Sequence, residues 1–116
     1  MPVSQFPTRA GEFVYSLGSV IERQMSIGSL TLQSKDPHVQ PRVQENFCAH
    51  DDDVRRLIDG VRFALEVGEH DAFDHLNAGV RSPSAAVIGD EDALADWIRN
   101  VASSGFHPSC AARMGP

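Results

Sequence analysis

Three consecutive aspartates stand immediately before the most strongly periodic stretch of this 116-residue chain. After Asp51, Asp52 and Asp53, apolar residues recur at the i, i+3, i+4, i+7 spacing of one helix face; they are Val54, Leu57, Ile58, Val61, Ala64 and Leu65. Aspartate accepts hydrogen bonds from the unpaired N–H groups at a helix start and suits the positive end of the helix dipole. The pattern predicts a long amphipathic helix, capped by one of the aspartates and ended at Gly68.

A second, shorter helix is predicted from Asp90, as its N-cap, to the stretch 103–105, where two serines and a glycine end it. Its apolar face holds Leu94, Trp97, Ile98 and Val101. Between the two helices, residues 71–76 are predicted to form one short helical turn. Residues 77–89 are rich in small side chains and are predicted to form a loop.

Two stretches alternate between apolar and polar residues, which is typical of half-buried strands. These are residues 13–22 and 29–34, and the glycine-containing turn between them predicts an antiparallel hairpin. Residues 35–45 contain Pro37 and Pro41 and are expected to be loop or edge structure. With residues 1–12 as an irregular lead-in, we expect an α+β fold. Its antiparallel sheet is incomplete in this chain, and its helices pack on one face of that sheet.

Composition narrows the classes of function. The length allows one domain at most, and the net charge of −6 with scattered basic residues argues against a nucleic-acid partner. The N-terminus lacks the apolar core of a secretory signal, and no stretch approaches the ~20 apolar residues of a membrane span. We therefore expect a cytoplasmic protein in which Cys48 and Cys110 are reduced thiols.

One of the five histidines stands apart from the others. His38, His50, His70 and His75 lie in predicted loops or near helix ends, and we interpret them as solvated surface residues. His107 instead lies between Phe106 and Pro108, directly after a predicted helix end. Proline biases the preceding residue away from helical geometry, so the imidazole sits on a stiff, extended segment that suits a general base. A purely structural role for His107 stays open at this point.

Other chemistries have weaker support. Cys48, His50 and the three aspartates bring metal-ligand types close together, but they match no zinc spacing. Cys110 lies three residues from His107 and within its reach, yet a buried or idle thiol is the simpler interpretation. Neither a GxGxxG nor a GxxxxGK[ST] motif occurs in the chain, so any dinucleotide would be bound by other polypeptide.

Two segments resemble the C-terminal, substrate-binding domain of glucose–methanol–choline (GMC) flavoprotein oxidoreductases. Within residues 28–47 the matching positions are Gly28, Leu30, Leu32, Ser34, Asp36, Pro37, Pro41, Val43, Asn46 and Phe47. The predicted helix at 51–67 follows at the expected place. In the last segment the matching positions are His107, Pro108, Met114 and Gly115. Many members have Gly-Thr where this chain has Cys110-Ala111, although the Ser-Cys pair that follows His-Pro here resembles choline-dehydrogenase-like members. The subfamily, choline-dehydrogenase-like or another alcohol dehydrogenase, stays open. The resemblance covers residues 13–116.

The resemblance implies an FAD-dependent enzyme that oxidises the CH–OH group of an alcohol. A hydride would pass from the carbinol carbon to flavin N5, and His107 would accept the hydroxyl proton. Phe106 and Pro108 would line the substrate pocket. An N-terminal FAD-binding domain of the same parent chain would precede Met1. A second catalytic His or Asn, and a further FAD-contacting segment, would follow Pro116. The competing interpretation is a small, non-enzymatic α+β interaction module.

Overall fold

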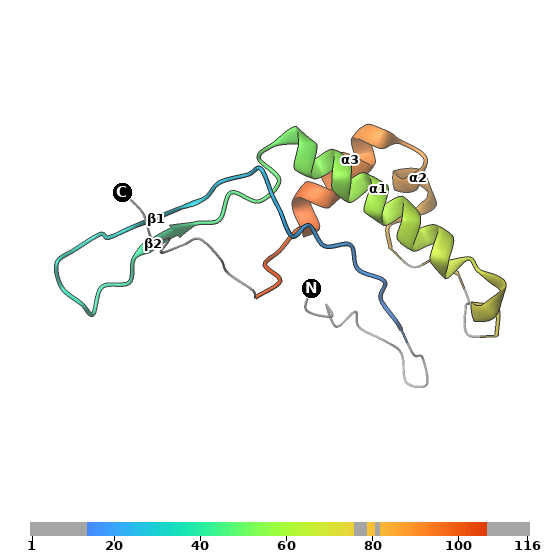
Figure 1. Cartoon of the computed structure of the whole chain (residues 1–116), viewed down its shortest axis with the longest axis horizontal. Helices are drawn as coiled ribbons and strands as arrows, with labels where there is room; N and C mark the ends of the chain where they lie inside the picture. Colours follow the sequence, from blue (N-terminus) through green and yellow to red (C-terminus); the bar gives the residue numbers. More distant parts are fainter. Residues whose placement is uncertain (1–13, 76–78, 81, 107–116) are drawn as a thin grey trace.

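The computed structural model describes residues 14–75, 79–80 and 82–106. Two short strands come first, β1 (Ser29–Thr31) and β2 (Arg42–Gln44). The long helix α1 (Asp51–Gly68), the 3₁₀ turn η1 (Asp71–Phe73), the short helix α2 (Ala85–Ile88) and the helix α3 (Glu91–Val101) follow. The strands form a narrow ribbon that projects from the group of helices (Figure 1).

The core lies where α1 and α3 pack together. Its buried apolar residues are Cys48, Val54, Ile58, Leu94 and Ile98, and Leu94 is fully inaccessible. Val54 and Ile58 are four residues apart on α1, as are Leu94 and Ile98 on α3, so each helix turns one stripe toward the other. The predicted apolar faces of both helices are therefore confirmed, although Val101 at the end of α3 stays 42% exposed.

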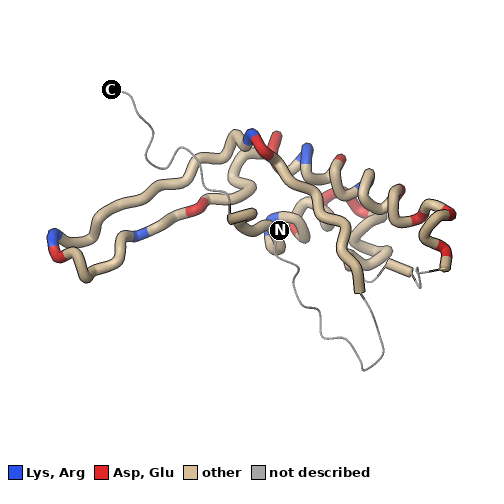
Figure 2. The backbone as a smooth tube through the Cα atoms, turned by 60° about the horizontal axis from the view of Figure 1, so that its bottom comes forward, with Lys and Arg blue, Asp and Glu red and all other residues tan. Residues whose placement is uncertain are grey.

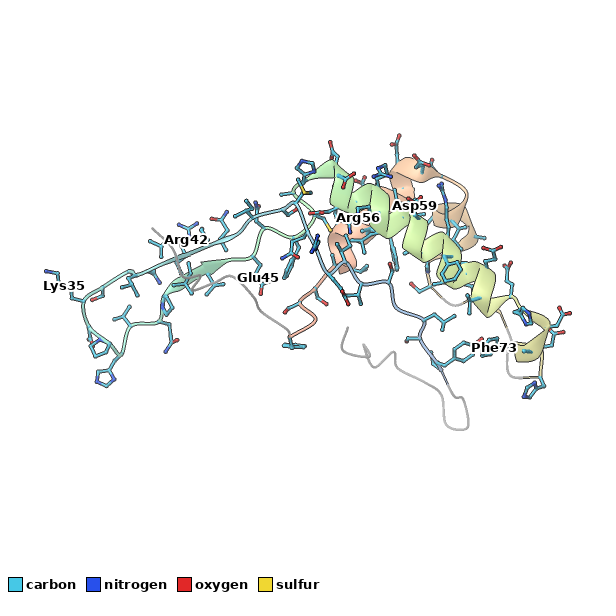
Figure 3. The ribbon with its side chains drawn as sticks, viewed as in Figure 1. Lys35, Arg42, Glu45, Arg56, Asp59 and Phe73 are labelled. Atoms are coloured by element: carbon cyan, nitrogen blue, oxygen red, sulfur yellow. The ribbon has the colours of Figure 1, made fainter. Side chains whose placement is uncertain are left out.

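An extended segment, residues 14–27, runs along α1 from its C-terminal end to its N-terminal end (Figure 1). We call this segment the strap. The Tyr15 ring stacks on Phe73 just beyond the helix, with ring centroids 6.0 Å apart, and Figure 3 labels Phe73 there. Further along, Ser19 crosses α1 at Gly60, where a Cβ atom would overlap the serine side chain. The glycine thus permits a close approach at which any side chain would force Ser19 to move.

The strap corrects the prediction of a strand over residues 13–22. The described part, from residue 14, has no strand partner and follows the surface of a helix instead. Alternating polarity indicates only that an extended segment has one apolar and one polar face. A segment that lies on a helix therefore shows the same pattern as a strand in a sheet. Phe13 lies outside the described residues, as does the predicted lead-in at 1–12.

The observed ribbon pairs different segments from those predicted. β1 lies antiparallel to β2, with Leu30 opposite Val43 and Thr31 opposite Arg42. The strand predicted within 29–34 is therefore present, but its partner comes from the proline-containing stretch 35–45 rather than from 13–22. Pro41 directly precedes β2 and so costs no ladder hydrogen bond within it, which is why the stretch can form an edge strand.

The helical half confirms some predictions and corrects others. His50, not an aspartate, is the N-cap of α1, because its Nδ1 accepts the N–H of Asp52 at 3.2 Å. Asp90 caps α3 as predicted, accepting the N–H of Ala93 at 3.0 Å. The stretch predicted as loop contains α2, one turn capped by Ser84. The end of α1 at Gly68 agrees with the prediction. So does the short turn after it, over the described residues.

The α+β class is confirmed. The helices lie beyond one end of the ribbon, and all six strand residues are exposed (Figure 1). The core therefore belongs to the helices, and the ribbon's apolar side chains, such as Leu30 at 57% and Val43 at 61%, remain accessible. Within the described ranges, no helix has the length and apolarity needed to cross a bilayer.

So small a core predicts a chain of low stability on its own. Leu94→Ala removes the only fully buried apolar side chain among those described, which typically costs about 2–5 kcal/mol and would abolish the folded helices. Val101→Ala, on the same helix but 42% exposed, is the matched control and should leave the helical signal in place. Circular dichroism during urea titration measures both. A cooperative transition retained by Leu94→Ala would contradict the assignment of this core.

Candidate active site

The segment that leads to the predicted base leaves the end of α3. Ala102 closes the helix by donating its N–H to the Ile98 carbonyl at 2.8 Å. Two residues later, the Ser104 hydroxyl accepts the N–H of Phe106 at 3.0 Å. Phe106 is 72% exposed and has a left-handed backbone with φ of 60°. His107 and Pro108 lie outside the described residues, so their roles as base and pocket wall stay predictions, as does the pocket role of Phe106.

α3 is held against α1 at several points. Arg99 of α3 reaches Asp51 at the start of α1 at 3.1 Å, and Arg62 of α1 reaches Glu91 of α3 at 2.8 Å. These pairs are exposed and contribute little free energy each. The buried contact around Leu94 therefore carries most of the attachment of α3 to α1.

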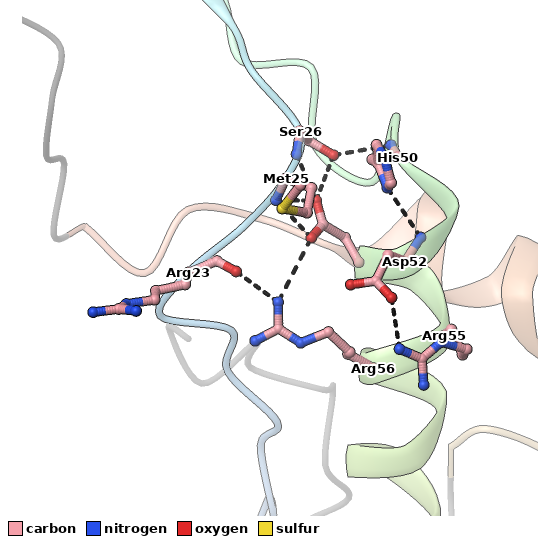
Figure 4. A network of polar contacts seen from close by, with 8 residues as sticks. Arg23, Met25, Ser26, His50, Asp52, Arg55 and Arg56 are labelled. Carbon is pink, nitrogen blue, oxygen red and sulfur yellow. Dashed lines mark hydrogen bonds and ion pairs between the residues drawn. The ribbon is translucent and has the colours of Figure 1, made fainter.

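The most highly organised polar cluster surrounds Asp53, which is 2% exposed. Figure 4 labels its neighbours Met25, Ser26 and Arg56. Its carboxylate accepts the Met25 N–H at 2.8 Å, the Ser26 N–H at 2.7 Å and the Ser26 hydroxyl at 2.6 Å. Arg56, one turn further along α1, donates to the Arg23 carbonyl at 2.6 Å and lies 4.0 Å from Asp53. We call this cluster the Asp53 clasp, because it fastens the end of the strap to the first turn of α1.

His50 closes the clasp from the other side. Its backbone N–H donates to the Ser26 hydroxyl at 3.0 Å, while its ring caps α1. One histidine thus joins the strap to the helix start. Sequence reasoning placed His38, His50, His70 and His75 on the surface, and all four are exposed. It missed the capping role of His50, for which the only signal was its position directly before the acidic run.

Opposing influences act on the Asp53 carboxyl. Burial disfavours its charge and would raise its pKa, but the hydrogen bonds from Ser26 and from the Met25 amide, with the charge of His50, lower the pKa below its ordinary value. Asp53 is therefore ionised in the folded chain. The neighbouring Asp52 also has a lowered pKa, through its hydrogen bond from Arg55 at 2.6 Å, but it lies at the surface and does not touch the strap.

Cys48 is a poor candidate for chemistry. It is 8% exposed, and burial raises the pKa of its thiol; the negative charge of Asp53 raises it further, and Arg99 opposes both. A thiol with a raised pKa is a weak nucleophile, so packing accounts for it. Cys110 lies outside the described residues. Among those described, no group of three or more His, Cys, Asp or Glu side chains is placed to hold a metal ion.

A hollow on the ribbon does not have the properties of a substrate pocket. Its lining consists of Ile27, Gly28, Ser29, Gln44 and Asn46, and its volume is about 140 Å³. Ligand pockets usually measure about 300–1,000 Å³. The Asn46 side chain also donates to the Ile27 carbonyl at 3.0 Å, and so is engaged in holding the ribbon.

The described residues do not fit the pyrophosphate of a dinucleotide. Phosphates are bound by helix N-termini whose free N–H groups and dipole attract negative charge. Here α1 begins with Asp51, Asp52 and Asp53, and α3 follows Asp90 with Glu91 and Asp92. Figure 2 shows acidic residues spread along the helical half of the chain. These carboxylates use the positive helix ends themselves and would repel a phosphate.

The comparisons with known proteins assign the class of this domain. A family model for GMC oxidoreductases matches residues 24–116, and the chain therefore belongs to the GMC oxidoreductase family, as its C-terminal domain. Among curated proteins, it is 37% identical over 91 residues to the oxygen-dependent choline dehydrogenases of Staphylococcus aureus strains JH9 and Newman. That match covers 78% of this chain but 16% of each relative's length. No solved structure matches the chain.

The Asp53 clasp predicts that the attachment of the strap to α1 depends on Asp53 and on pH. Asp53→Asn replaces one acceptor oxygen by a donor facing other donors, and hydrogen bonds to a charged group contribute about 1.5–3 kcal/mol. The Met25 and Ser26 amides should then lose their protection from hydrogen exchange. Asp52→Asn, one residue away in the same helix turn, is the matched control and should leave both amides protected.

The pH dependence of this attachment follows from the direction in which folding shifts the pKa of Asp53. The pKa of Asp53 is lower folded than unfolded, so its stabilising contribution is complete above the unfolded value of about 3.9 and is lost as pH falls through the folded value. Asp53→Asn should remove that acid-sensitive contribution. Equal exchange protection of Met25 in both variants at pH 6 would show that the clasp does not hold the strap.

Proposed function

We propose that this chain is the substrate-side part of an FAD-dependent oxidoreductase that acts on the CH–OH group of alcohols. The observation that carries the proposal is the family match over residues 24–116, which includes His107, Pro108, Met114 and Gly115. The 37% identity to oxygen-dependent choline dehydrogenases supports a choline-like alcohol as the first substrate to test. Family membership favours this reaction over the non-enzymatic interaction module.

In this proposal His107 accepts the hydroxyl proton of the alcohol. Imidazole has an intrinsic pKa of about 6.5, so near pH 7 it is largely neutral and basic. Phe106 precedes it with a side chain that is 72% exposed. An exposed aromatic face attracts a quaternary ammonium group, so Phe106 suits the trimethylammonium end of choline. Pro108 restricts His107 to extended geometry from the other side.

We propose that FAD is held by polypeptide outside this chain and supplies the oxidising chemistry there. The acidic starts of α1 and α3 support this division, and the chain spans only 16% of the length of the relatives it matches. A cytoplasmic location stays a prediction of the same proposal. In the proposal this chain supplies the proton acceptor, His107.

If FAD is held by polypeptide outside this chain, the isolated chain should not bind FAD tightly. With carboxylates at both longer helix starts, it has no described site for the pyrophosphate, so titration with FAD should give no saturable change in flavin fluorescence up to the micromolar range. Riboflavin, which lacks the pyrophosphate, is the control ligand. Saturable binding of FAD below micromolar concentration, without matching riboflavin binding, would show that this chain contains a phosphate site.

The function itself is tested by His107→Ala in the full-length protein that contains this chain, with choline and benzyl alcohol as substrates. General-base catalysis typically contributes about 10²–10⁴-fold, so kcat/KM should fall by that range while the FAD content stays normal. The loss should shrink at high pH, where more of the alcohol is ionised. His38→Ala and His75→Ala, both at exposed positions, are controls expected within a few-fold of the unaltered enzyme. Retained activity of His107→Ala across pH 6–9 would refute the assignment.

A further inference from the structure

Two histidines cap helical turns in the same way at opposite ends of α1. His50 precedes α1, and its Nδ1 accepts the Asp52 N–H at 3.2 Å. His70 precedes η1, directly beyond the other end of α1, and its Nδ1 accepts the Ala72 N–H, also at 3.2 Å. Both residues are exposed, so protons from the solvent reach both rings.

Each of these caps requires a neutral imidazole ring. Nδ1 accepts a hydrogen bond only while the proton of the ring is on Nε2, because both nitrogens of an imidazolium are donors. A protonated Nδ1 would place its hydrogen opposite the amide hydrogen that it now binds. Histidine changes its charge between about pH 5 and 8. Both cap bonds are therefore present above this range and are lost as the pH falls through it.

Carboxylates near the two rings attract an imidazolium but cannot preserve its cap. Around His50 the charged groups come from the first turns of α1 and from α3; they are Asp51, Asp52, Asp53, Arg55, Arg56 and Arg99. His70 is flanked by Glu69 and Asp71, and the strap brings the Tyr15 ring to the same turn. An ion pair through either ring nitrogen leaves Nδ1 protonated, so the attraction stabilises the charge of the ring without restoring the cap.

The two caps differ in what else holds the turn. At the start of α1 the Asp53 clasp remains when the cap is lost, because the pKa of Asp53 lies below its ordinary value and its carboxylate stays charged throughout the histidine range. η1 is a single 3₁₀ turn, a type of helix whose hydrogen bonds have poorer geometry. Its backbone bonds join the Phe73 N–H to the His70 carbonyl at 2.8 Å and the Asp74 N–H to the Asp71 carbonyl at 3.2 Å. The cap therefore contributes a larger share of the stability of η1 than of α1.

η1 in turn holds the start of the strap. Phe73 is its last residue, and the Tyr15 ring stacks on Phe73 with ring centroids 6.0 Å apart. We propose that His70 is a pH-sensitive latch for the start of the strap. In mild acid η1 loses its cap, Phe73 is no longer held against Tyr15, and the strap loosens from that end. Its other end stays attached to α1 through the Asp53 clasp. This inference does not depend on the reaction proposed for the parent protein.

The test measures hydrogen–deuterium exchange in the full-length protein that contains this chain, at about pH 7.5 and about pH 5.5, with each rate corrected for the intrinsic pH dependence of exchange. Protection of the Phe73 and Asp74 amides should fall about 2–30-fold at the lower pH, the range that loss of an N-cap produces. The Met25 and Ser26 amides, which Asp53 binds, should keep their protection.

Asparagine substitutions distinguish His70 from the other histidines. His70→Asn retains a side-chain acceptor that does not titrate, and asparagine is among the best N-caps, so the protection of η1 should become equal at both pH values. His50→Asn, which alters the other titrating cap, and His38→Asn, at an exposed position between β1 and β2, are the matched controls. Both should retain the fall in protection at η1.

Three results would overturn the latch. They are unchanged protection of η1 in the unaltered protein, a fall of the same size in His70→Asn, and an equal fall at Met25 and Ser26, which would mean that release is not confined to one end. If His70→Asn does not fold, exchange of the imidazole C2 hydrogen in the unaltered protein gives the pH at which His70 gains its proton. The loss of protection at η1 should follow that midpoint. A loss at a pH where His70 is still neutral, or already fully protonated, would equally refute the latch.

Discussion

The buried carboxylate of Asp53 is the interaction on which the arrangement of this chain depends. It accepts hydrogen bonds from two backbone amides and a hydroxyl, all from the strap, which take the place of water. These bonds stabilise a charge that burial would otherwise disfavour. The same residue lies in the first turn of α1, where the helix dipole also favours negative charge. One side chain thereby joins the start of the long helix to a segment 27–28 residues earlier in the chain.

The clasp also determines where the ribbon begins. The strap ends at Ile27, whose carbonyl accepts the Asn46 side chain, and β1 starts two residues later. Because Ser26 is fastened to α1 and His50 is fastened to Ser26, the two ends of the 23-residue excursion between them are held together at the helix start. The ribbon therefore leaves the helices from a closed base, and its direction is set there rather than by its own three-residue strands.

The helices were predictable from sequence because their stabilising contacts are periodic and local. The stripe through Val54 and Ile58 and the cap at Asp90 each depend on residues within a few positions of one another. The strap was not predictable, because alternation along residues 13–22 is the same whether the partner is a strand or a helix. The crossing at Gly60 and the bond from the His50 N–H depend on contacts with Ser19 and Ser26, more than twenty residues away.

In the candidate site, too, the sequence predicted what its motifs contain but not what depends on the folded backbone. The sequence motif around His107 identified the family and the proposed base, because motif positions need no tertiary information. The left-handed Phe106 and its bond to Ser104 could not be anticipated, since phenylalanine is an unusual residue for positive φ. Sequence reasoning thus lacked the geometry of residues 102–106, which lie between α3 and the proposed base.

The ribbon has a consequence for how these residues behave when they are produced by themselves. Over the part of the chain that the structure describes, each of its strands is an edge strand, with one apolar face around Leu30 and Val43. Unprotected edges with accessible apolar side chains template pairing between copies, which leads to open-ended aggregates rather than closed dimers. Lys35 and Arg42, labelled on the ribbon in Figure 3, add charge that counteracts such stacking. We therefore expect association at the ribbon to add to the low stability of the helical core when this segment is produced by itself.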